Sequence, residues 1–146
     1  MQKTELKNKS GKVYFTVEYN KTTEVIYANW LGFVSVEEVI TGATKCLEAF
    51  ESTKCPNFIN DNRLLTGPWN KANDWIANTW MPRALKAGLK NFAFVMSPNI
   101  FGELSAKDLE THLDNVGFVM KNFKDYDLAT AWIKSRIEER NSVAAG

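Results

Sequence analysis

The sequence predicts an α/β fold in which about four helices pack on a mostly parallel sheet of about five strands, opened by an antiparallel hairpin. Segments with apolar residues at every second position alternate along the chain with segments in which they recur every third or fourth position. Strands that alternate with helices favour parallel pairing. The length of 146 residues suits one domain. We place this domain at residues 12–140, between flexible ends at residues 1–11 and 141–146.

Two strands open the domain. Residues 13–19 alternate apolar and polar side chains, which is the period of a strand. Asn20-Lys21-Thr22 supplies a turn, and residues 24–30 form the second strand, which ends at Gly32. We therefore expect an antiparallel hairpin at one edge of the sheet.

A helix follows the hairpin. Ser35 and Glu38 have the spacing of a capping box, in which each side chain bonds the backbone amide of the other residue. Apolar side chains then recur at helical spacing, at Val36, Val39, Ile40, Ala43, Leu47 and Phe50. Pro56 follows the end of this helix. Cys46 lies on the apolar side, so we expect a buried thiol, and a regulatory bridge to Cys55 is the alternative.

The middle of the chain predicts a short strand, a loop and a second helix. Residues 57–60 form the strand and residues 61–67 the loop. Pro68 suits the first position of a helix, and Pro82 predicts a kink near Asn78. Gly88 ends the helix in a left-handed conformation. One helix face carries Trp69, Ala72, Ile76, Trp80, Ala84 and Ala87.

The remainder of the chain predicts a strand, a helix, a strand and a helix. The continuous apolar run over residues 91–97 suits a central strand that is covered on both faces. Another helix starts at Ser105, and residues 118–123 form the last strand. Asp125 caps the final helix. The inward side chains of that helix are expected to be Leu128, Ala131, Trp132 and Ile133.

Composition excludes several classes of function. Eighteen Lys and Arg against seventeen Asp and Glu leave a net charge of +1, which points away from nucleic acid as a partner. The longest strictly apolar run, residues 92–96, is far shorter than the roughly 18–20 residues that span a bilayer. Residues 1–12 are polar and have no signal-peptide pattern, and the chain has two cysteines, so we expect a cytoplasmic protein.

The sequence lacks the common motifs for cofactors and catalysis. The eight glycines are at least ten residues apart, which excludes a dinucleotide fingerprint and a phosphate-binding loop. No Gly-x-Ser-x-Gly elbow occurs, and one histidine cannot form a multi-histidine zinc site. We expect no cofactor, no metal and no enzyme activity. The alternative is a dyad of Asp108 and His112, one helical turn apart, for which no nucleophile is identified.

Asp61, Asn62 and Arg63 form the first candidate binding site. They follow a central strand and precede a helix, where the ligands of open α/β sheets gather and where a helix N-terminus favours anions. The fork of donors on Arg63 would add to such a site. The alternative is that Asp61 and Asn62 form turns with the backbone and that Arg63 is a surface charge.

Tryptophans form the second candidate site. The chain has five, of which Trp69 and Trp80 share the apolar face of the second helix. Trp75 lies off that face and is expected at the surface. These side chains form either the aromatic wall of an apolar pocket or core packing with one interface residue.

Four groups of short segments occur in a fixed order within residues 13–137. They are Trp30-Leu31-Gly32 before Ser35-Val36-Glu37-Glu38, then Asn60-Asp61-Asn62-Arg63, then Trp80-Met81-Pro82 before Lys86-Ala87-Gly88-Leu89-Lys90, and finally Phe123-x-Asp125 with Ala129, Trp132 and Ile133. Together they resemble the SpoIIAA-like group of small bacterial proteins, which is STAS-like and linked in fold to the CRAL-TRIO lipid-exchange domains. The stretch from Asn60 to Trp69 resembles members from the Bacteroidetes.

The resemblance implies a regulatory module of the bacterial cytoplasm that binds a protein partner and forms a homodimer. Some STAS-like regulators are phosphorylated on a Ser or Thr after the third strand. Here no Ser stands at that place, and only Thr66, several residues further on, could replace it. The fold link to CRAL-TRIO domains implies the alternative function, a carrier that holds a small molecule or lipid in an apolar pocket beside the tryptophan-rich helix.

Overall fold

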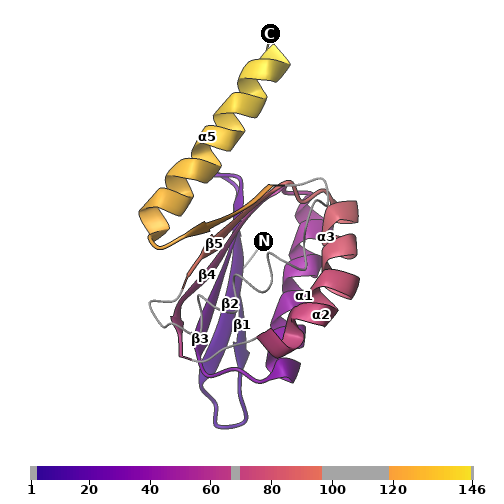
Figure 1. The fold of residues 1–146 in the computed structure, drawn as a ribbon, viewed down its shortest axis with the longest axis vertical. Helices are drawn as coiled ribbons and strands as arrows, with labels where there is room; N and C mark the ends of the chain where they lie inside the picture. Colours follow the sequence, from indigo (N-terminus) through magenta and orange to yellow (C-terminus); the bar gives the residue numbers. More distant parts are fainter. Residues whose placement is uncertain (1–2, 67–69, 97–118, 146) are drawn as a thin grey trace.

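The computed structural model describes residues 3–66, 70–96 and 119–145 (Figure 1). The described strands form one sheet in the order β1-β2-β3-β4-β5-β6. Their bounds are β1 (Thr4–Lys7), β2 (Val13–Asn20), β3 (Val25–Gly32), β4 (Asn57–Leu65), β5 (Asn91–Val95) and β6 (Val119–Phe123). The described helical segments are α1 (Val36–Thr53), η1 (Asn70–Ala72), α2 (Asn73–Trp75), η2 (Ile76–Trp80), α3 (Met81–Ala87) and α5 (Tyr126–Ala145). The predicted helix from Ser105, with Asp108 and His112, lies outside the described residues.

The sheet is mixed. The strands β1, β2 and β3 pair antiparallel, and β3, β4, β5 and β6 pair parallel. The α/β class and the opening hairpin are therefore confirmed, but the sheet has six described strands instead of about five. The additional strand is β1, which lies within residues 1–11, the segment predicted to be a flexible end. Its Lys-rich sequence resembles a tail, yet Leu6 packs against the core and Thr4 pairs with Val17.

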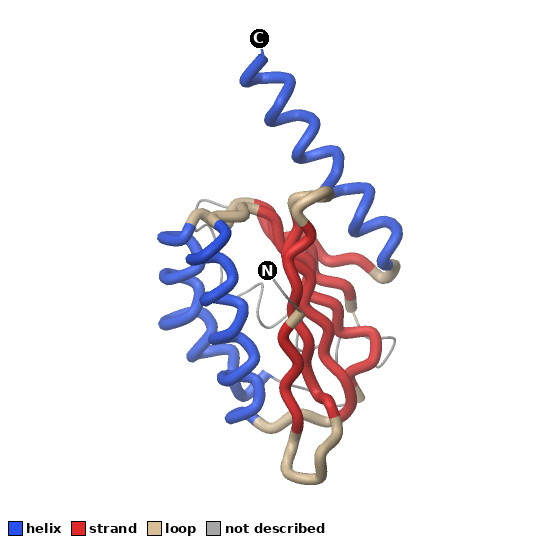
Figure 2. Tube along the Cα trace, turned by 180° about the vertical axis from the view of Figure 1, so that it is seen from behind, coloured by secondary structure: helices blue, strands red, loops and turns tan. Residues whose placement is uncertain are grey.

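Helices cover both faces of the sheet (Figures 1 and 2). The helix α1 and the run from α2 to α3 lie on one face, which we call the inner face. The helix α5 lies on the opposite, outer face, against β4, β5 and β6. The larger core fills the inner face, where Phe50 packs edge-on against both Phe58 and Trp80. A smaller core under α5 includes Ala129 and Ile133.

The start of α1 confirms the predicted capping box. Ser35 N donates to Glu38 Oε1 (2.9 Å), and Glu38 N donates to Ser35 Oγ (3.1 Å). Further along the helix, Gly42 lies against the Trp30 ring, since a Cβ at Gly42 would stand 2.6 Å from Trp30 Cη2. The helix therefore approaches the sheet more closely there than any larger residue would allow.

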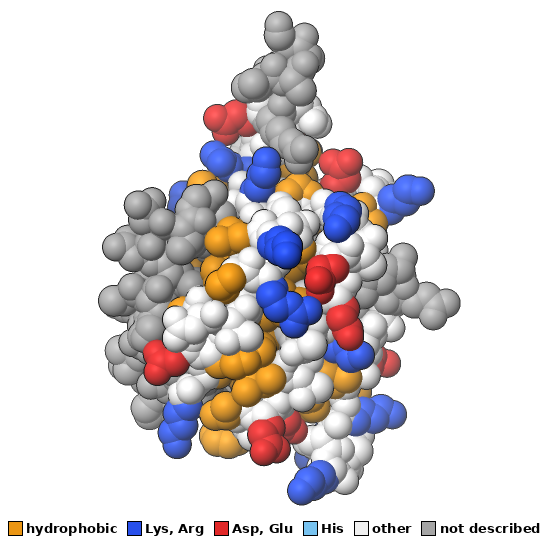
Figure 3. Space-filling model, turned by 90° about the vertical axis from the view of Figure 1, so that its right-hand side faces the viewer, with side chains coloured by type: hydrophobic (Ala, Val, Ile, Leu, Met, Phe, Trp, Pro, Cys, Tyr) orange, Lys and Arg blue, Asp and Glu red, His pale blue; other side chains and the backbone are white. Residues whose placement is uncertain are grey.

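Figure 3 looks onto the helix layer that covers the inner face. Lys and Arg side chains are interspersed with Asp and Glu side chains on this surface. Arg83 of α3 pairs with Glu51 of α1 at 3.0 Å, which bridges the two helices. Because both signs of charge alternate, this surface has no single-sign field to attract a polyanion.

The second helical region changes its winding before Pro82. The residues Ile76–Trp80 form a π-helical turn, in which Met81 N donates to Ile76 O. Pro82 carries no N–H to continue the usual ladder, so the helix accommodates it with this wider turn at the predicted position of the kink. Gly88 adopts the predicted left-handed cap, with φ of +109°. The predicted buried face is confirmed at Ala72, Ile76, Trp80, Ala84 and Ala87.

The strand β4 is longer than predicted. Residues 61–65 continue the strand, so the loop predicted to carry Asp61, Asn62 and Arg63 is wrong. Asn and Asp favour turns when their side chains bond the nearby backbone. In this structure Asp61 Oδ1 does accept from the nearby Arg63 N (3.0 Å), but Tyr27 of the neighbouring strand also donates to Asp61, and Asn62 reaches carbonyls of β4 and β5. Tertiary contacts therefore override the local turn preference.

A β-bulge interrupts the pairing of β4 with β3. Asp61 pairs with Asn29 and Leu64 pairs with Leu31, so three steps along β4 match two along β3. The bulge shifts the alternation of side chains by one position. As a result Leu65 is buried on the inner face, whereas Leu64 is 55% exposed.

The cap of α5 matches the prediction, but its buried face matches only at Trp132 and Ile133. Asp125 Oδ1 accepts hydrogen bonds from the backbone N of Asp127 (2.6 Å) and of Leu128 (3.3 Å). Leu128, predicted to face inward, is 61% exposed, and Ala131 is exposed as well. The side chains that meet the sheet recur every four residues, at Ala129, Ile133 and Ile137.

The helix α5 also continues further than predicted. It extends to Ala145, past the expected end of the domain at residue 140 and into residues 141–146, the segment predicted to be a flexible end. Figure 1 shows its C-terminal half reaching beyond the edge of the sheet.

Candidate functional site

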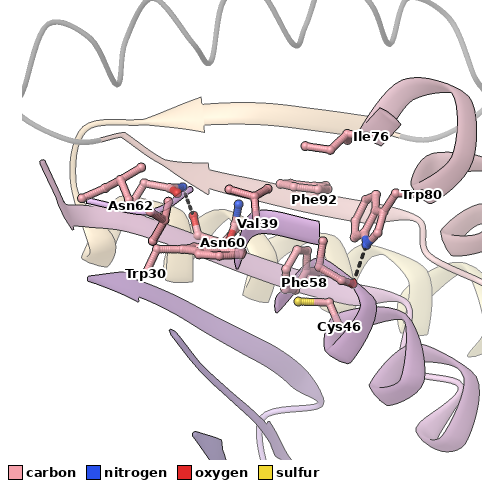
Figure 4. A pocket seen from close by; sticks show the side chains of 12 residues that line it. Trp30, Val39, Cys46, Phe58, Asn60, Asn62, Ile76, Trp80 and Phe92 are labelled. Carbon is pink, nitrogen blue, oxygen red and sulfur yellow. Dashed lines mark hydrogen bonds between the residues drawn. The ribbon is translucent and has the colours of Figure 1, made fainter. Parts of the chain in front are cut away.

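An apolar cavity lies between the inner face of the sheet and the helical segments α1 and η2 (Figure 4). It measures about 40 Å³, which is room for the centres of about three water molecules. One end lies at the carboxyl ends of β3 and β4, beside Val34 and Leu65. The lining side chains are Trp30, Val34, Val39, Ala43, Cys46, Phe58, Asn60, Asn62, Leu65, Ile76, Trp80 and Phe92.

Two tryptophans are held in place by their ring nitrogens. Trp80 Nε1 donates to Ala43 O of α1 (2.7 Å), and Trp30 Nε1 donates to Asn60 Oδ1 of β4 (2.7 Å). With their only polar atoms used in this way, both rings present apolar surface to the cavity. Phe58 and Phe92, which pack edge-on against each other, complete the aromatic wall.

Asn60 and Asn62 supply carboxamide groups to the described lining of this cavity. They stand two residues apart on β4, so the alternation of the strand places both on the inner face. Asn62 Nδ2 donates to Asn60 O (3.1 Å) and, at 3.5 Å, to Val95 O. The exposed fractions are only 8% for Asn60 and 2% for Asn62. The cavity thus combines an aromatic wall with two fixed carboxamides.

The described residues that line the cavity carry no charge. Among them, Cys46 is the only one whose side chain titrates in water between about pH 4 and 10. Burial raises the pKa of the Cys46 thiol, with a smaller opposing effect from a backbone hydrogen bond. The group therefore stays protonated at neutral pH and acts as an apolar wall.

Asp61 and Arg63 lie on the opposite face of β4 from this cavity. Arg63 Nη2 and Nε donate to Asp61 Oδ2 (2.7 and 3.1 Å), and Tyr27 Oη donates to the same oxygen (2.5 Å). Burial raises the pKa of Asp61, but the hydrogen bonds from Arg63 and Tyr27 outweigh it, so that the net pKa lies below its usual value. The Arg63 guanidinium also lies 5.1 Å from the ring centre of Tyr126 on α5.

This outer cluster joins α5 to the sheet. The ring of Tyr126 meets Tyr27 edge-on at 5.5 Å, and both rings contact the Asp61–Arg63 pair. The donor fork of Arg63 is directed at Asp61, so it is not the free anion-binding group that the sequence suggested. Asp61, Asn62 and Arg63 therefore do not form one site, because β4 divides them between its two faces.

The remaining candidates are placed as follows. Trp75, expected at the surface, is half-buried against the inner core. Thr66 is exposed just after β4, and its backbone N donates to Gly32 O (3.0 Å). Trp69 lies outside the described residues. Sequence reasoning singled out Trp80 and Asn62 but missed Asn60 and Trp30, because only the pairing of β3 with β4 brings that pair together.

A second, polar cavity of about 210 Å³ lies at the other end of the sheet, near the C-terminus of α1. Its inner asparagines form a chain of bonds. Arg136 Nε donates to Asn91 Oδ1 (3.1 Å), Asn91 Nδ2 donates to Asn57 Oδ1 (2.9 Å), and Asn57 Nδ2 donates to Glu24 O (2.9 Å). Both halves of each of these two carboxamides are used within the protein, so this network ties α5 to the sheet.

Comparison of the chain with known protein families, with curated proteins and with solved structures found no match. Within the described ranges, no cluster of three or more His, Cys, Asp or Glu side chains has the arrangement of a metal site. No helix in the described part of the chain has the length and apolar character needed to cross a membrane.

Proposed function

We propose that this chain is a non-catalytic binding module that takes a small neutral molecule, or the neutral end of a larger one, into the cavity beneath α1 and η2. The observation that carries this proposal is the pair of buried carboxamides, Asn60 and Asn62, in a cavity with aromatic walls. Protein interiors are normally filled to crystal density, so an apolar cavity with built-in polar groups is typical of a ligand site.

The size of the cavity limits the ligand. A volume of about 40 Å³ is too small for a lipid chain, since a cavity of roughly 150 Å³ is needed to hold benzene. We therefore propose that only the head of the ligand enters, at the carboxyl ends of β3 and β4, where the ligands of α/β sheets gather. This differs from a carrier that encloses a whole lipid.

The side chains of the cavity support binding without turnover. Among the described lining residues, Cys46 is the only one with a nucleophilic side chain, and its raised pKa keeps it as the unreactive thiol. No described lining residue is a base that would activate it.

A regulatory role through a protein partner or a homodimer is the second proposal, in keeping with the SpoIIAA-like resemblance and with a bacterial cytoplasmic protein. The observation that favours it is a pair of exposed apolar side chains at the carboxyl ends of neighbouring strands, which we call the rim. Phe33 is 72% exposed directly after β3, and Leu64 is 55% exposed near the end of β4. Exposed apolar side chains at one end of a sheet favour contact with a partner.

Native mass spectrometry tests the first proposal. The protein, purified gently from its own host, should carry a small mass that is lost on denaturation. Cys46→Leu should abolish it by filling the cavity, whereas Cys55→Leu, the same change at a buried thiol outside that cavity, should retain it. The proposal is wrong if no bound mass is found and a fragment screen gives no thermal shift. A phosphate that survives denaturation would instead direct attention to Thr66.

Light scattering tests the second proposal. Phe33→Ser and Leu64→Ser should weaken self-association or partner binding, whereas Leu128→Ser, an equally exposed leucine on α5, should leave it unchanged. Equal effects of all three variants would contradict an interface at the rim.

A further inference from the structure

We infer that the ligand of the inner cavity presents a neutral hydrogen-bond acceptor beside a donor, as a carboxamide or lactam does. Asn60 then donates to the acceptor, and Asn62 accepts from the donor. The inference rests on the proposed binding function and names the chemistry of its ligand. The inference follows from which carboxamide atom of each asparagine, oxygen or nitrogen, is already hydrogen-bonded within the protein.

The orientation of the Asn60 side chain is set by Trp30. An indole N–H can only donate, so the atom that it bonds at 2.7 Å must be the oxygen, Asn60 Oδ1. The other half, Asn60 Nδ2, has no hydrogen-bond partner among the described residues. It is therefore an open donor that stays accessible from the cavity, on a side chain with an exposed fraction of 8%.

The orientation of Asn62 is set by two carbonyl groups. Asn60 O and Val95 O can only accept, so the atom that faces both must be the nitrogen, Asn62 Nδ2. The oxygen, Asn62 Oδ1, is then the half without a hydrogen-bond partner in the described part of the chain. The cavity consequently offers one N–H donor and one oxygen acceptor, both fixed in their roles.

These two groups select a neutral partner. A carboxylate would satisfy Asn60 Nδ2 but would bring its charge against Asn62 Oδ1, and none of the described lining side chains carries a positive charge to offset it. An ammonium ion would satisfy Asn62 Oδ1 but would leave Asn60 Nδ2 facing a donor. A carboxamide or lactam satisfies both, because its carbonyl accepts from Asn60 and its N–H donates to Asn62.

Water is the competing occupant. About three water molecules fit in the cavity by volume. Each buried water usually makes two to four hydrogen bonds, whereas the side chains of the wall offer two open groups among aromatic and aliphatic surfaces. An amide head that uses both groups and covers the aromatic wall therefore displaces water favourably.

The experiment compares matched amides and acids. Isobutyramide and benzamide are titrated against isobutyrate and benzoate at pH 7.5, and binding is followed by two-dimensional NMR of the wild-type protein. We expect the amides to bind about tenfold more tightly than the acids, with the side-chain NH₂ signals of Asn60 and Asn62 shifting on binding. The inference is overturned if acids bind as well as amides, or if the two NH₂ signals do not move when a ligand occupies the cavity.

Asn60→Asp sharpens the test. The new carboxylate still accepts from Trp30 Nε1 but has no donor in place of Asn60 Nδ2, so amide affinity should fall about tenfold or more. Asn57→Asp is the matched control, a buried asparagine of the same strand outside this cavity, and amide affinity should stay within about twofold. The wild-type NH₂ signals decide the question if a variant does not fold.

The outcomes separate the two proposals. Ligands that shift the signals of Trp80 and Phe92 without preferring amides leave the binding function standing and refute the inference. If no compound binds and the protein carries no small molecule, both are wrong, and ordered water fills the cavity.

Discussion

Gly42→Ala tests whether the close approach of α1 to Trp30 is needed for the fold. Two effects oppose each other at this position. Alanine is favoured over glycine in a helix interior by about 1 kcal/mol. The added Cβ, however, would stand 2.6 Å from Trp30 Cη2, 3.0 Å from Trp30 Cζ3 and 3.1 Å from Phe15 Cγ. Contacts below 3.0 Å require one of these groups to move.

Neither ring can move without loss. Trp30 is fixed by its bond to Asn60 at 2.7 Å and packs on Phe15 with ring centres 4.4 Å apart. Overpacking a rigid core costs about 1–3 kcal/mol, and loss of the indole bond adds about 1 kcal/mol. After the helical preference is subtracted, we expect Gly42→Ala to lower the free energy of unfolding by about 1–3 kcal/mol.

Urea denaturation measures this change, with Thr41→Ala as the control. Thr41 is an exposed neighbour on the same helix, so its replacement should be neutral or slightly stabilising. The variant Trp30→Phe removes the atoms that clash, and so Gly42→Ala should cost less in that background by about 1 kcal/mol or more. If the two effects add within about 0.5 kcal/mol, or if Gly42→Ala stabilises the protein, the packing argument is refuted.

Three further predictions concern other parts of the fold. Hydrogen bonds hold the pKa of Asp61 in the folded protein below its usual value. The stability that ionised Asp61 contributes is therefore complete above the unfolded pKa of about 3.9, and it is lost as the pH falls through the folded pKa. Asp61→Asn should therefore lower the free energy of unfolding by about 1–3 kcal/mol at pH 7, and it should make that free energy fall less steeply between pH 5 and 2. Urea titrations that show the same fall for wild type and variant would contradict this. Ser35→Ala should cost about 1 kcal/mol by removing the cap of α1, and a change below about 0.3 kcal/mol would show the cap to be unimportant. Burial raises the pKa of both Cys46 and Cys55, so a thiol reagent should label them only as fast as the protein opens, and labelling at the rate of a free thiol would disprove their burial.

Local patterns predicted the elements whose cause is local. The bonds of the capping box at Ser35, the left-handed Gly88 and the cap at Asp125 lie within one or two turns of chain, and the structure confirms all three. Strand β1 was not predicted because its four residues show no clear alternation of apolar side chains. Leu6 becomes partly buried only when β1 pairs with β2. Leu128 was placed inward because helical spacing alone does not show which side of α5 meets the sheet.

The candidate site was predicted only in part, for a related reason. Trp80 was recognised from its helical spacing, which is a property of one element. Asn60 was not, since its role depends on Trp30, thirty residues away along the chain and brought close by the sheet. The family resemblance stays a prediction, and it does not indicate this pair.

The end of β4 explains why we assign function to the inner face. On the outer face Asp61 and Arg63 satisfy each other and Tyr27, so the polar groups there are used in holding the fold. On the inner face, one polar atom of each carboxamide, Asn60 Oδ1 and Asn62 Nδ2, is hydrogen-bonded within the protein. The other polar atom of each has no partner among the described residues. A polar group that serves only stability gains nothing from burial without a partner, because burial in that state costs about 1–3 kcal/mol. The open halves of the two asparagines avoid that cost because they stay accessible from the cavity, and a ligand that enters there can bond both.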